Sequence, residues 1–203
     1  MRDLSDTAHE ARGKQKFERG GIWYTPQSGI WQTVWAECVP EDCIKKLKIT
    51  PNFDEAFVEV SAETVGGNAA YAEFNGERYP LPAKIPVPDF EAWSPEHPKL
   101  YDFAVVYGED RVESYFAMRK FSVEKDEKGV KRLFLNGKSY FHNGLLDQGY
   151  WSDGMYTAPS DEALIFDIQT AKDMGFNMLR KHIKVEPLRW YYHCDIVAAE
   201  LGQ

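Results

Sequence analysis

The chain has 203 residues, with 24 lysines and arginines against 32 aspartates and glutamates, so its formal net charge is −8 at pH 7. This acidic balance argues against a nucleic-acid partner, because no basic field attracts the phosphate backbone. A hydrophobic fraction of 43% is enough for a core and is not typical of disorder. No apolar run approaches the roughly 18 residues of a membrane span, and the polar amino terminus lacks a secretory signal. We therefore expect a soluble chain without a membrane partner and leave its compartment, cytoplasmic or periplasmic, unknown.

The three cysteines are Cys38, Cys43 and Cys194. An odd, scattered set is no disulfide framework, so we expect free thiols. Together with His193, these cysteines could in principle bind zinc, but their spacing fits no standard zinc motif. We therefore expect no metal site and no cofactor.

The amino-terminal part has the composition of β-structure. Residues 22–24 and 30–37 are runs of β-branched and aromatic residues, divided by a turn that contains proline and glycine. Neither face of the second run is strongly polar. That pattern predicts a strand covered on both sides.

Short strands of similar spacing follow. Within residues 56–63 the side chains alternate with period two, which is the signature of a half-buried strand. Four prolines between residues 80 and 88 indicate an edge or an extended connection, because proline cannot donate to a ladder. Several such strands with turns between them predict a small antiparallel sandwich. The predicted strands cover residues 44–49, 56–63, 70–74, 100–107 and 113–119.

The pattern changes after about residue 124. An Asn-Gly pair at residues 136–137 between short apolar runs predicts a hairpin. Ser160, followed by two acidic residues, predicts a helix start, and Gly175 stands where that helix should end. Residues 176–179 form an apolar strand pattern, and a second helical pattern follows Pro187. Strand, helix, strand and helix in this order indicate a parallel α/β unit.

Five segments carry more specific patterns. They are SGIWQTVW (28–35), WSPEHPKLY (93–101), LNGK (135–138), DMGFNMLRKH (173–182) and WYYHCD (190–195). In this order they resemble glycoside hydrolase family 2, the β-galactosidase and β-glucuronidase family. They are similar, in turn, to the last jelly-roll strand, a segment of the immunoglobulin-like domain, the hairpin entering the catalytic barrel, the first barrel helix with the second strand, and the second barrel helix.

The resemblance implies a mainly β chain with a carboxyl-terminal α/β part. An immunoglobulin-like β-sandwich would span residues 39–124. The last strands of an incomplete jelly-roll sugar-binding domain would precede it at residues 1–38, and the first two βα units of an incomplete TIM-barrel glycosidase domain would follow at residues 125–203. The tail after Asp195 departs from the family pattern. We therefore expect a truncated family member whose exposed strand edges favour a homo-oligomer.

Glycoside hydrolysis needs two carboxyl groups on opposite sides of the scissile bond. In the resembled family both are glutamates that follow the fourth and seventh barrel strands, so the resemblance assigns no catalytic residue to this chain. It implies a supporting role for Arg180, whose counterpart lies close to the nucleophilic carboxylate. It also implies hydroxyl recognition by His182, whose counterpart lies at the sugar site.

Other candidate substrate-binding residues surround the predicted strand ends. Asp147 and Glu186 should follow adjacent strands, where they bind either sugar hydroxyls or neighbouring protein groups. Gln148 and Trp151 suit a pyranose, whose C–H face stacks on aromatic rings while its hydroxyls need polar partners. The alternative is that Tyr150 and Trp151 belong to a loop that packs on the missing part of the jelly roll.

The sequence thus predicts part of a retaining exo-glycosidase, β-galactosidase-like, that hydrolyses O-glycosidic bonds in β-galactosides or related carbohydrates. Without the two catalytic glutamates we expect the isolated chain to be inactive. The alternative is a non-catalytic β-sandwich protein that binds carbohydrate or a partner through its aromatic residues. The βα tail distinguishes the two, because a binding module has no use for the start of a barrel.

Overall fold

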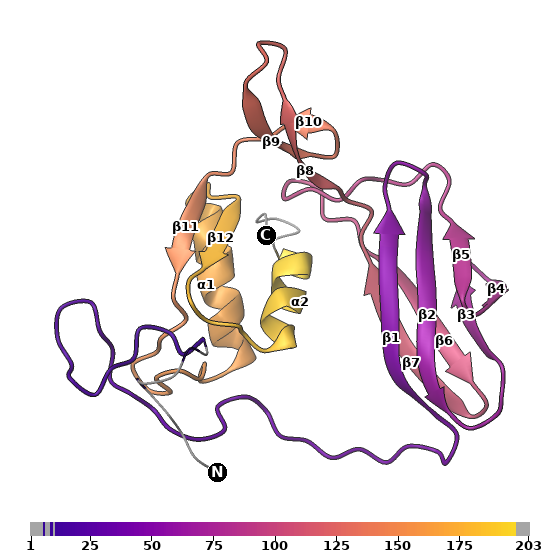
Figure 1. Ribbon diagram of the computed structural model, residues 1–203, viewed down its shortest axis with the longest axis horizontal. Coiled ribbons are helices and arrows are strands. Elements are labelled where there is room, and N and C mark those ends of the chain that lie inside the picture. Colours follow the sequence, from indigo (N-terminus) through magenta and orange to yellow (C-terminus); the bar gives the residue numbers. More distant parts are fainter. Residues whose placement is uncertain (1–5, 7–8, 10, 198–203) are drawn as a thin grey trace. The chain divides into compact units, whose positions relative to one another are not determined.

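The computed structural model describes residues 6, 9 and 11–197, and the chain divides into two compact units. The first unit combines Met1–Trp35 with His142–Gln203, and the second comprises Ala36–Phe141. Figure 1 shows the elements of both units in the order of the chain. Among the described residues, no helix has the length and apolar character needed to cross a membrane.

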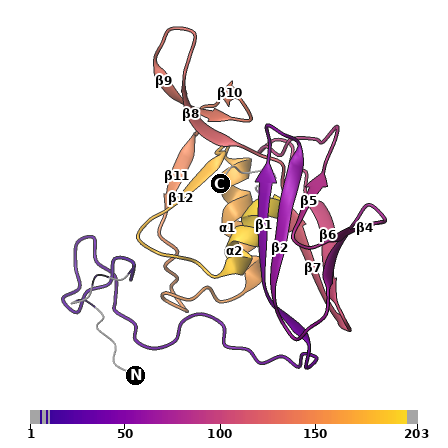
Figure 2. The ribbon, with the colours of Figure 1, turned by 45° about the vertical axis from the view of Figure 1, so that its right-hand side comes forward.

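The second unit contains two antiparallel sheets that face each other (Figure 2). One has the strand order β1-β2-β5 and the other the order β4-β3-β6-β7. This arrangement confirms the predicted sandwich. The strands are β1 (Cys43–Asn52), β2 (Phe57–Val65), β3 (Ala70–Phe74), β4 (Glu77–Pro80), β5 (Ala83–Pro86), β6 (Tyr101–Tyr107) and β7 (Asp110–Phe116).

The core of the sandwich comes from alternating positions. In β2, Val58 and Val60 are fully buried, while Glu59 between them is exposed. Period-two burial of this kind places every second side chain between the sheets. The buried members of this core are Val58, Val60, Ala72, Phe74, Ile85, Val87, Phe103, Val105, Phe116 and Met118.

The second unit ends in a small three-stranded sheet of order β10-β9-β8. Its strands are β8 (Phe121–Lys125), β9 (Lys131–Leu135) and β10 (Lys138–Ser139). Asn136 and Gly137 join β9 to β10 with φ angles of 54° and 75°. Two positive φ values in a two-residue loop are typical of a type I′ turn, so the predicted hairpin is confirmed.

The predicted strands at residues 22–24 and 30–37 are wrong. That segment has no β-ladder, although Trp23 and Tyr24 take part in isolated bridges. β-branched and aromatic residues form a strand only where a neighbour accepts the backbone hydrogen bonds. Among the described residues no strand lies beside this segment, and most of residues 32–39 are exposed.

The first unit is built on a two-stranded parallel sheet of β11 (Gly144–Asp147) and β12 (Met178–Lys181). The helix α1 (Asp161–Asp173) follows β11, and α2 (Leu188–Val197) follows β12. This order confirms the predicted strand, helix, strand and helix. The chain is therefore mainly β, with an α/β part at its carboxyl-terminal end.

Local signals fix the helices of the first unit. The side-chain oxygen of Ser160 accepts the backbone N–H of Ala163 at 3.2 Å, which caps α1. Gly175 has a φ of 84°, the left-handed conformation that ends a helix. The helices bury a small shared core, against which β11 and β12 pack through Leu145 and Leu179. Its buried members are Leu164, Ile168, Ala171, Trp190 and Cys194.

Candidate functional site

The two parallel strands carry side chains to two different faces. The register pairs Leu145 with Leu179 and Leu146 with Arg180. Leu145 and Leu179 pack against the helix core, whereas Leu146 is 52% exposed and Arg180 is also exposed. Because successive side chains alternate, the strands have a helix side and an open face, the latter defined by Leu146 and Arg180.

Arg180 and His182 form a pair at the carboxyl end of β12. The Nη1 atom of Arg180 lies 3.2 Å from Nδ1 of His182. A guanidinium can only donate, so Nδ1 accepts and a neutral His182 carries its proton on Nε2. The backbone N–H of His182 donates to the carbonyl of Asp147 at 2.8 Å, which holds the residue beside the end of β11.

Four charged side chains meet on the helix side and form the ion-pair cluster of Asp147, Lys181, Lys184 and Glu186. The Nζ atom of Lys181 lies 2.5 Å from Oδ2 of Asp147 and 2.9 Å from Oε1 of Glu186. Lys184 lies 2.9 Å from the same Glu186 oxygen. The side chains of Lys184 and Glu186 are only 0% and 3% exposed. Two buried cations therefore balance two carboxylates, as burial of charge requires.

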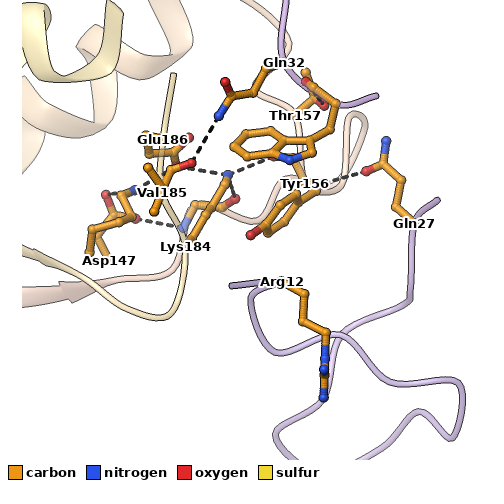
Figure 3. A network of polar contacts seen from close by, with 12 residues as sticks. Arg12, Gln27, Gln32, Asp147, Tyr156, Thr157, Lys184, Val185 and Glu186 are labelled. Carbon is orange, nitrogen blue, oxygen red and sulfur yellow. Dashed lines mark hydrogen bonds and ion pairs between the residues drawn. The ribbon is translucent and has the colours of Figure 1, made fainter. Parts of the chain in front are cut away.

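Lys184 is the centre of this arrangement (Figure 3). Its ammonium group donates to the carbonyls of Gly149 at 2.5 Å and Tyr156 at 2.8 Å. It also lies 4.5 Å from the ring centroid of Tyr156 and 5.0 Å from that of Trp31. Burial lowers the pKa of Lys184, against the opposing effect of the Glu186 charge. Burial, and secondarily the same carboxylate, raises the pKa of Tyr156 to about 12.

The amino-terminal segment is bound to the loop after β11 by single side-chain hydrogen bonds. Oε1 of Gln27 accepts the N–H of Tyr156 at 2.8 Å. Within the segment itself, Oε1 of Gln15 accepts the N–H of Gln27 at 2.6 Å. Thr157 donates its hydroxyl to the carbonyl of Trp31 at 3.0 Å. Figure 3 shows Gln27 and Thr157 reaching across this junction. These bonds make the segment one wall of the site.

The aromatic residues after β11 pack on the protein. Tyr150 stacks on Tyr24 with ring centroids 4.3 Å apart, and its hydroxyl donates to the carbonyl of Thr25 at 2.5 Å. Trp151 packs against the helix core. Tyr150 therefore packs on the amino-terminal segment of this chain.

A pocket of about 370 Å³ opens between β11, its following loop and α1. Asp147, Gln148 and Trp151 line it from the strand end and loop, Asp167 from α1, and Tyr24 from the amino-terminal segment. Burial and the charge of Asp147 raise the pKa of Asp167. Oε1 of Gln148 and Nε1 of Trp151 are buried and have no hydrogen-bond partner among the described residues. The pocket thus combines two carboxylates with an aromatic wall.

Comparison with known proteins identifies two β-galactosidases as relatives by sequence. The β-galactosidase of Lactococcus lactis subsp. lactis is 28% identical over 198 residues, which cover 88% of this chain and 19% of the relative. The β-galactosidase of Leuconostoc mesenteroides subsp. mesenteroides is 24% identical over 209 residues, which cover 88% of this chain and 20% of the relative. The chain therefore spans about a fifth of the length of the curated relatives it matches. No protein-family model matches it.

Solved structures show the same fold. A glycoside hydrolase family 2 β-galacturonidase from Eisenbergiella tayi, bound to galacturonate, has a TM-score of 0.69 at 18% identity, over 79% of this chain and 32% of that one. The β-glucuronidase of Faecalibacterium prausnitzii has a TM-score of 0.70 at 18% identity, over 78% of this chain and 27% of that one. The chain is related to glycoside hydrolase family 2. The resemblance of the chain to this family is therefore confirmed.

The six predicted substrate-binding residues lie in three places. Arg180 and His182 lie at the open face. Asp147 and Glu186 belong to the ion-pair cluster. Gln148 and Trp151 line the pocket, and Asp147 lines it as well. The structure therefore does not bring them together into one site. Sequence reasoning missed both lysines of the ion-pair cluster. Lys181 offered a signal, because it directly follows Arg180 in β12 and alternation therefore turns it to the helix side, where Asp147 lies. Lys184 lies beyond the end of β12, where strand alternation places no side chain.

Proposed function

We propose that the chain is a part of a retaining exo-glycosidase of the β-galactosidase type, and that its open face contributes to the sugar site. The observation that carries the proposal is the Arg180–His182 pair, 3.2 Å apart at the carboxyl end of a parallel strand. In barrel enzymes the active site lies at this end of the strands. The relatives by sequence are both β-galactosidases, which favours that sugar.

Each member of the pair has a distinct role in this proposal. The guanidinium of Arg180 orients the nucleophilic glutamate and keeps it ionised through charge-assisted hydrogen bonds. His182 accepts from Arg180 through Nδ1, so its Nε2–H is the atom that donates to a sugar hydroxyl. In the family the nucleophile and the acid follow later barrel strands, and neither glutamate has a counterpart in this chain.

The isolated chain is inactive under this proposal. Retaining hydrolysis needs two carboxyl groups about 5–5.5 Å apart, with one protonated as the acid. Asp147 and Glu186 do not offer that pair, because Lys181 binds both and Lys184 also binds Glu186. Both carboxylates are therefore already bound by cations. Their proposed function is to position the loops around the sugar site.

The proposed domain organisation keeps the family order. Residues 1–38 are assigned to the end of a jelly roll, 39–124 to an immunoglobulin-like sandwich and 125–203 to the start of a barrel. A parallel sheet is normally covered on both faces, and the open face exposes Leu146. Association through this face or through strand edges follows, with homo-oligomers as the form expected of the isolated chain.

The sandwich offers the site that a non-catalytic binding protein would use. A pocket of about 260 Å³ is lined by Phe53, Asp54, Phe57 and Lys120, among others. Lys120 is paired with Asp54 at 2.6 Å. An aromatic wall with a charged rim fits a small polar ligand, so this pocket stands as the second candidate.

A titration with a galactose-configured iminosugar, followed by NMR of the isotope-labelled chain, tests the proposal. We expect shifts of the Arg180 and His182 side chains, lost in Arg180→Met and His182→Phe, and no turnover of nitrophenyl β-galactoside. Arg78→Met and His97→Phe, exposed residues of the second unit, are matched controls. Shifts confined to the pocket around Phe53 would favour the binding protein. Hydrolysis abolished by Glu186→Gln would contradict the assignment of that residue.

A further inference from the structure

A strained backbone position directly follows His182. Ile183, which lies between His182 and Lys184, has a φ of 46°, in the left-handed region. This conformation is uncommon for any residue other than glycine and is a genuine outlier for a β-branched side chain such as that of isoleucine. Strain of this kind persists only where the surrounding structure holds it, and it is concentrated at functional sites.

The left-handed residue changes the face on which the next side chain lies. Continued as a strand, the chain would place the side chains of residues 180, 182 and 184 on one face, because successive side chains alternate. Lys184 would then project onto the open face beside Arg180 and His182. In the structure the Lys184 side chain is instead fully buried in the ion-pair cluster, and Ile183 is 47% exposed. The turn at Ile183 therefore separates the open face from the buried cluster.

Contacts on both sides hold this turn. Before it, the backbone N–H of His182 donates to the carbonyl of Asp147 at 2.8 Å. At the turn itself, the carbonyl of Ile183 accepts the N–H of Gly13 at 2.8 Å. After it, the ammonium group of Lys184 donates to two carbonyls of the loop that follows β11 and pairs with a carboxylate. All of these residues belong to the first unit.

Lys184 fits its surroundings closely. A Cβ atom at Gly149 would lie 2.9 Å from Nζ of Lys184, so the ammonium group has little room to move. If Ile183 relaxed to an extended conformation, Lys184 would leave this position and the carbonyls of Gly149 and Tyr156 would lose their donor. Losing a donor to a buried acceptor is unfavourable. The contacts of Lys184 therefore offset the backbone strain at Ile183.

We propose that Lys184 is a positioning residue of the sugar site, which acts on His182 through Ile183. The buried ammonium group holds Ile183 in the left-handed conformation. This turn keeps the His182 ring where Nδ1 accepts from Arg180, which leaves Nε2–H as the donor to a sugar hydroxyl. The inference rests on the proposed function, because it names the residue that orients a group of that same site.

The experiment is NMR of the labelled chain at pH 8, where an ordinary histidine is neutral. It is read at Nδ1 of His182 and at the Nη signals of Arg180, which both report the hydrogen bond between these side chains. In the wild-type chain we expect a bonded Nδ1 and separate Nη signals, because the bond stops rotation of the guanidinium group. Lys184→Met should shift Nδ1 to the position of an unbonded nitrogen and merge the Nη signals. It should also weaken binding of the galactose-configured iminosugar about 2- to 10-fold, as expected for one hydrogen bond.

Ile183→Pro tests the same turn without removing a buried charge. Proline fixes φ near about −65° and so forbids the left-handed conformation. We expect this variant to lose the bonded Nδ1 signal and the separate Nη signals, as Lys184→Met does. Retention of these signals in either variant would overturn the inference.

Changes to residues that tolerate or resist the left-handed conformation test the route through Ile183. Asparagine adopts this conformation more readily than other side chains do, so Ile183→Asn alone should leave both signals unchanged. Combined with Lys184→Met, it should restore them at least in part. Ile183→Val keeps a β-branched side chain and is the matched control, which should not restore them. Equal results with asparagine and valine would overturn the inference.

Leu164→Ala controls for a general loss of stability, because it creates a cavity in the helix core of the same unit. It should leave the Arg180 and His182 signals unchanged, and an equal loss of these signals would overturn the inference. If the iminosugar shifts neither Arg180 nor His182 in the wild-type chain, while Lys184→Met still breaks their hydrogen bond, the proposed function is contradicted and the action of Lys184 on His182 is supported.

Discussion

The two units of the chain are stabilised by different kinds of interaction. The sandwich of the second unit rests on ten buried apolar residues supplied by facing sheets. The described part of the first unit has a core cluster of only five, and its loops are joined by buried charges and single side-chain hydrogen bonds. Apolar burial is non-directional and scales with area, whereas a buried polar network needs every member satisfied. Stability in the first unit is therefore concentrated in a few polar residues.

The largest effect should come from the core of the sandwich. Phe116 packs between Phe74, Tyr101 and Phe103, with ring centroids 5.4–5.9 Å away. Phe116→Ala removes those contacts and leaves a cavity, so we expect the free energy of unfolding of the second unit to fall by about 3–5 kcal/mol. Peptide-resolved hydrogen exchange measures it in β6 and β7.

The same measurement shows whether the two units are independent. Exchange in α1 of the first unit should stay unchanged in Phe116→Ala, because distant sites without shared partners contribute additively. Val123→Ala, at a 65% exposed position of the second unit, is the matched control and should change little. Equal loss of protection in both units would show that the comparison between them is wrong.

Where local chemistry decides the structure, the sequence predicts it well. The alternation in β2, the Asn136-Gly137 turn and the Ser160 cap are read from neighbouring residues, and the structure has all three. The strand prediction at residues 30–37 was wrong because it depended on more than neighbouring residues. Their composition encodes a strand, but whether a strand forms depends on a hydrogen-bonding neighbour that the local sequence does not specify.

The candidate site was predictable only in part. Strand alternation correctly places Arg180 away from the helices, because the period of two is a property of the strand itself. The burial of Lys184 was not predictable, since lysine is among the residues least often buried. Its partners are the carbonyls of Gly149 and Tyr156, 35 and 28 residues away, and such long-range polar contacts leave no periodic trace in the sequence.

The next largest loss of stability is expected from the ion-pair cluster, and it tests whether this cluster stabilises the first unit. Lys184→Met keeps the length of the side chain but leaves two carbonyls unsatisfied and Glu186 with only Lys181. Removing one partner of a buried pair costs about 3–5 kcal/mol. Because Glu186 retains one cation, we expect about 2–3 kcal/mol, measured by hydrogen exchange in α1 and α2.

A double-mutant cycle separates pairing from packing. If Glu186 is destabilising once Lys184 is gone, then Lys184→Met with Glu186→Gln should cost less than the sum of the two single changes. Lys120→Met is the control, since Lys120 forms an exposed pair with Asp54, and exposed pairs contribute little. Additive single effects would mean that the cluster is not cooperative and that the first unit is held by its apolar core.

The smallest effect is a dependence on pH that only the first unit should show. The pKa of Tyr156 is raised to about 12 from its ordinary value of 10.0, mainly by burial. Between these pH values the folded protein keeps a proton that the unfolded chain has lost, so the free energy of unfolding falls as the pH rises. A shift of this size corresponds to about 2–3 kcal/mol of stability, which is present below pH 10 and lost by pH 12.

Tyr156→Phe should remove this decline and leave stability near pH 7 almost unchanged, because the Tyr156 hydroxyl is buried without a partner among the described residues. The matched control is Tyr192→Phe, at a tyrosine of α2 that is 43% exposed. Unfolding of the first unit, followed by tryptophan fluorescence from pH 9 to 12, measures how the free energy of unfolding changes with pH. If Tyr156→Phe and the wild-type chain lose stability equally, Tyr156 titrates as freely in the folded state as in the unfolded one. The loop around Lys184 would then be open to water. In that case the first unit would not be stabilised by a buried polar network, as the comparison of the two units assumes.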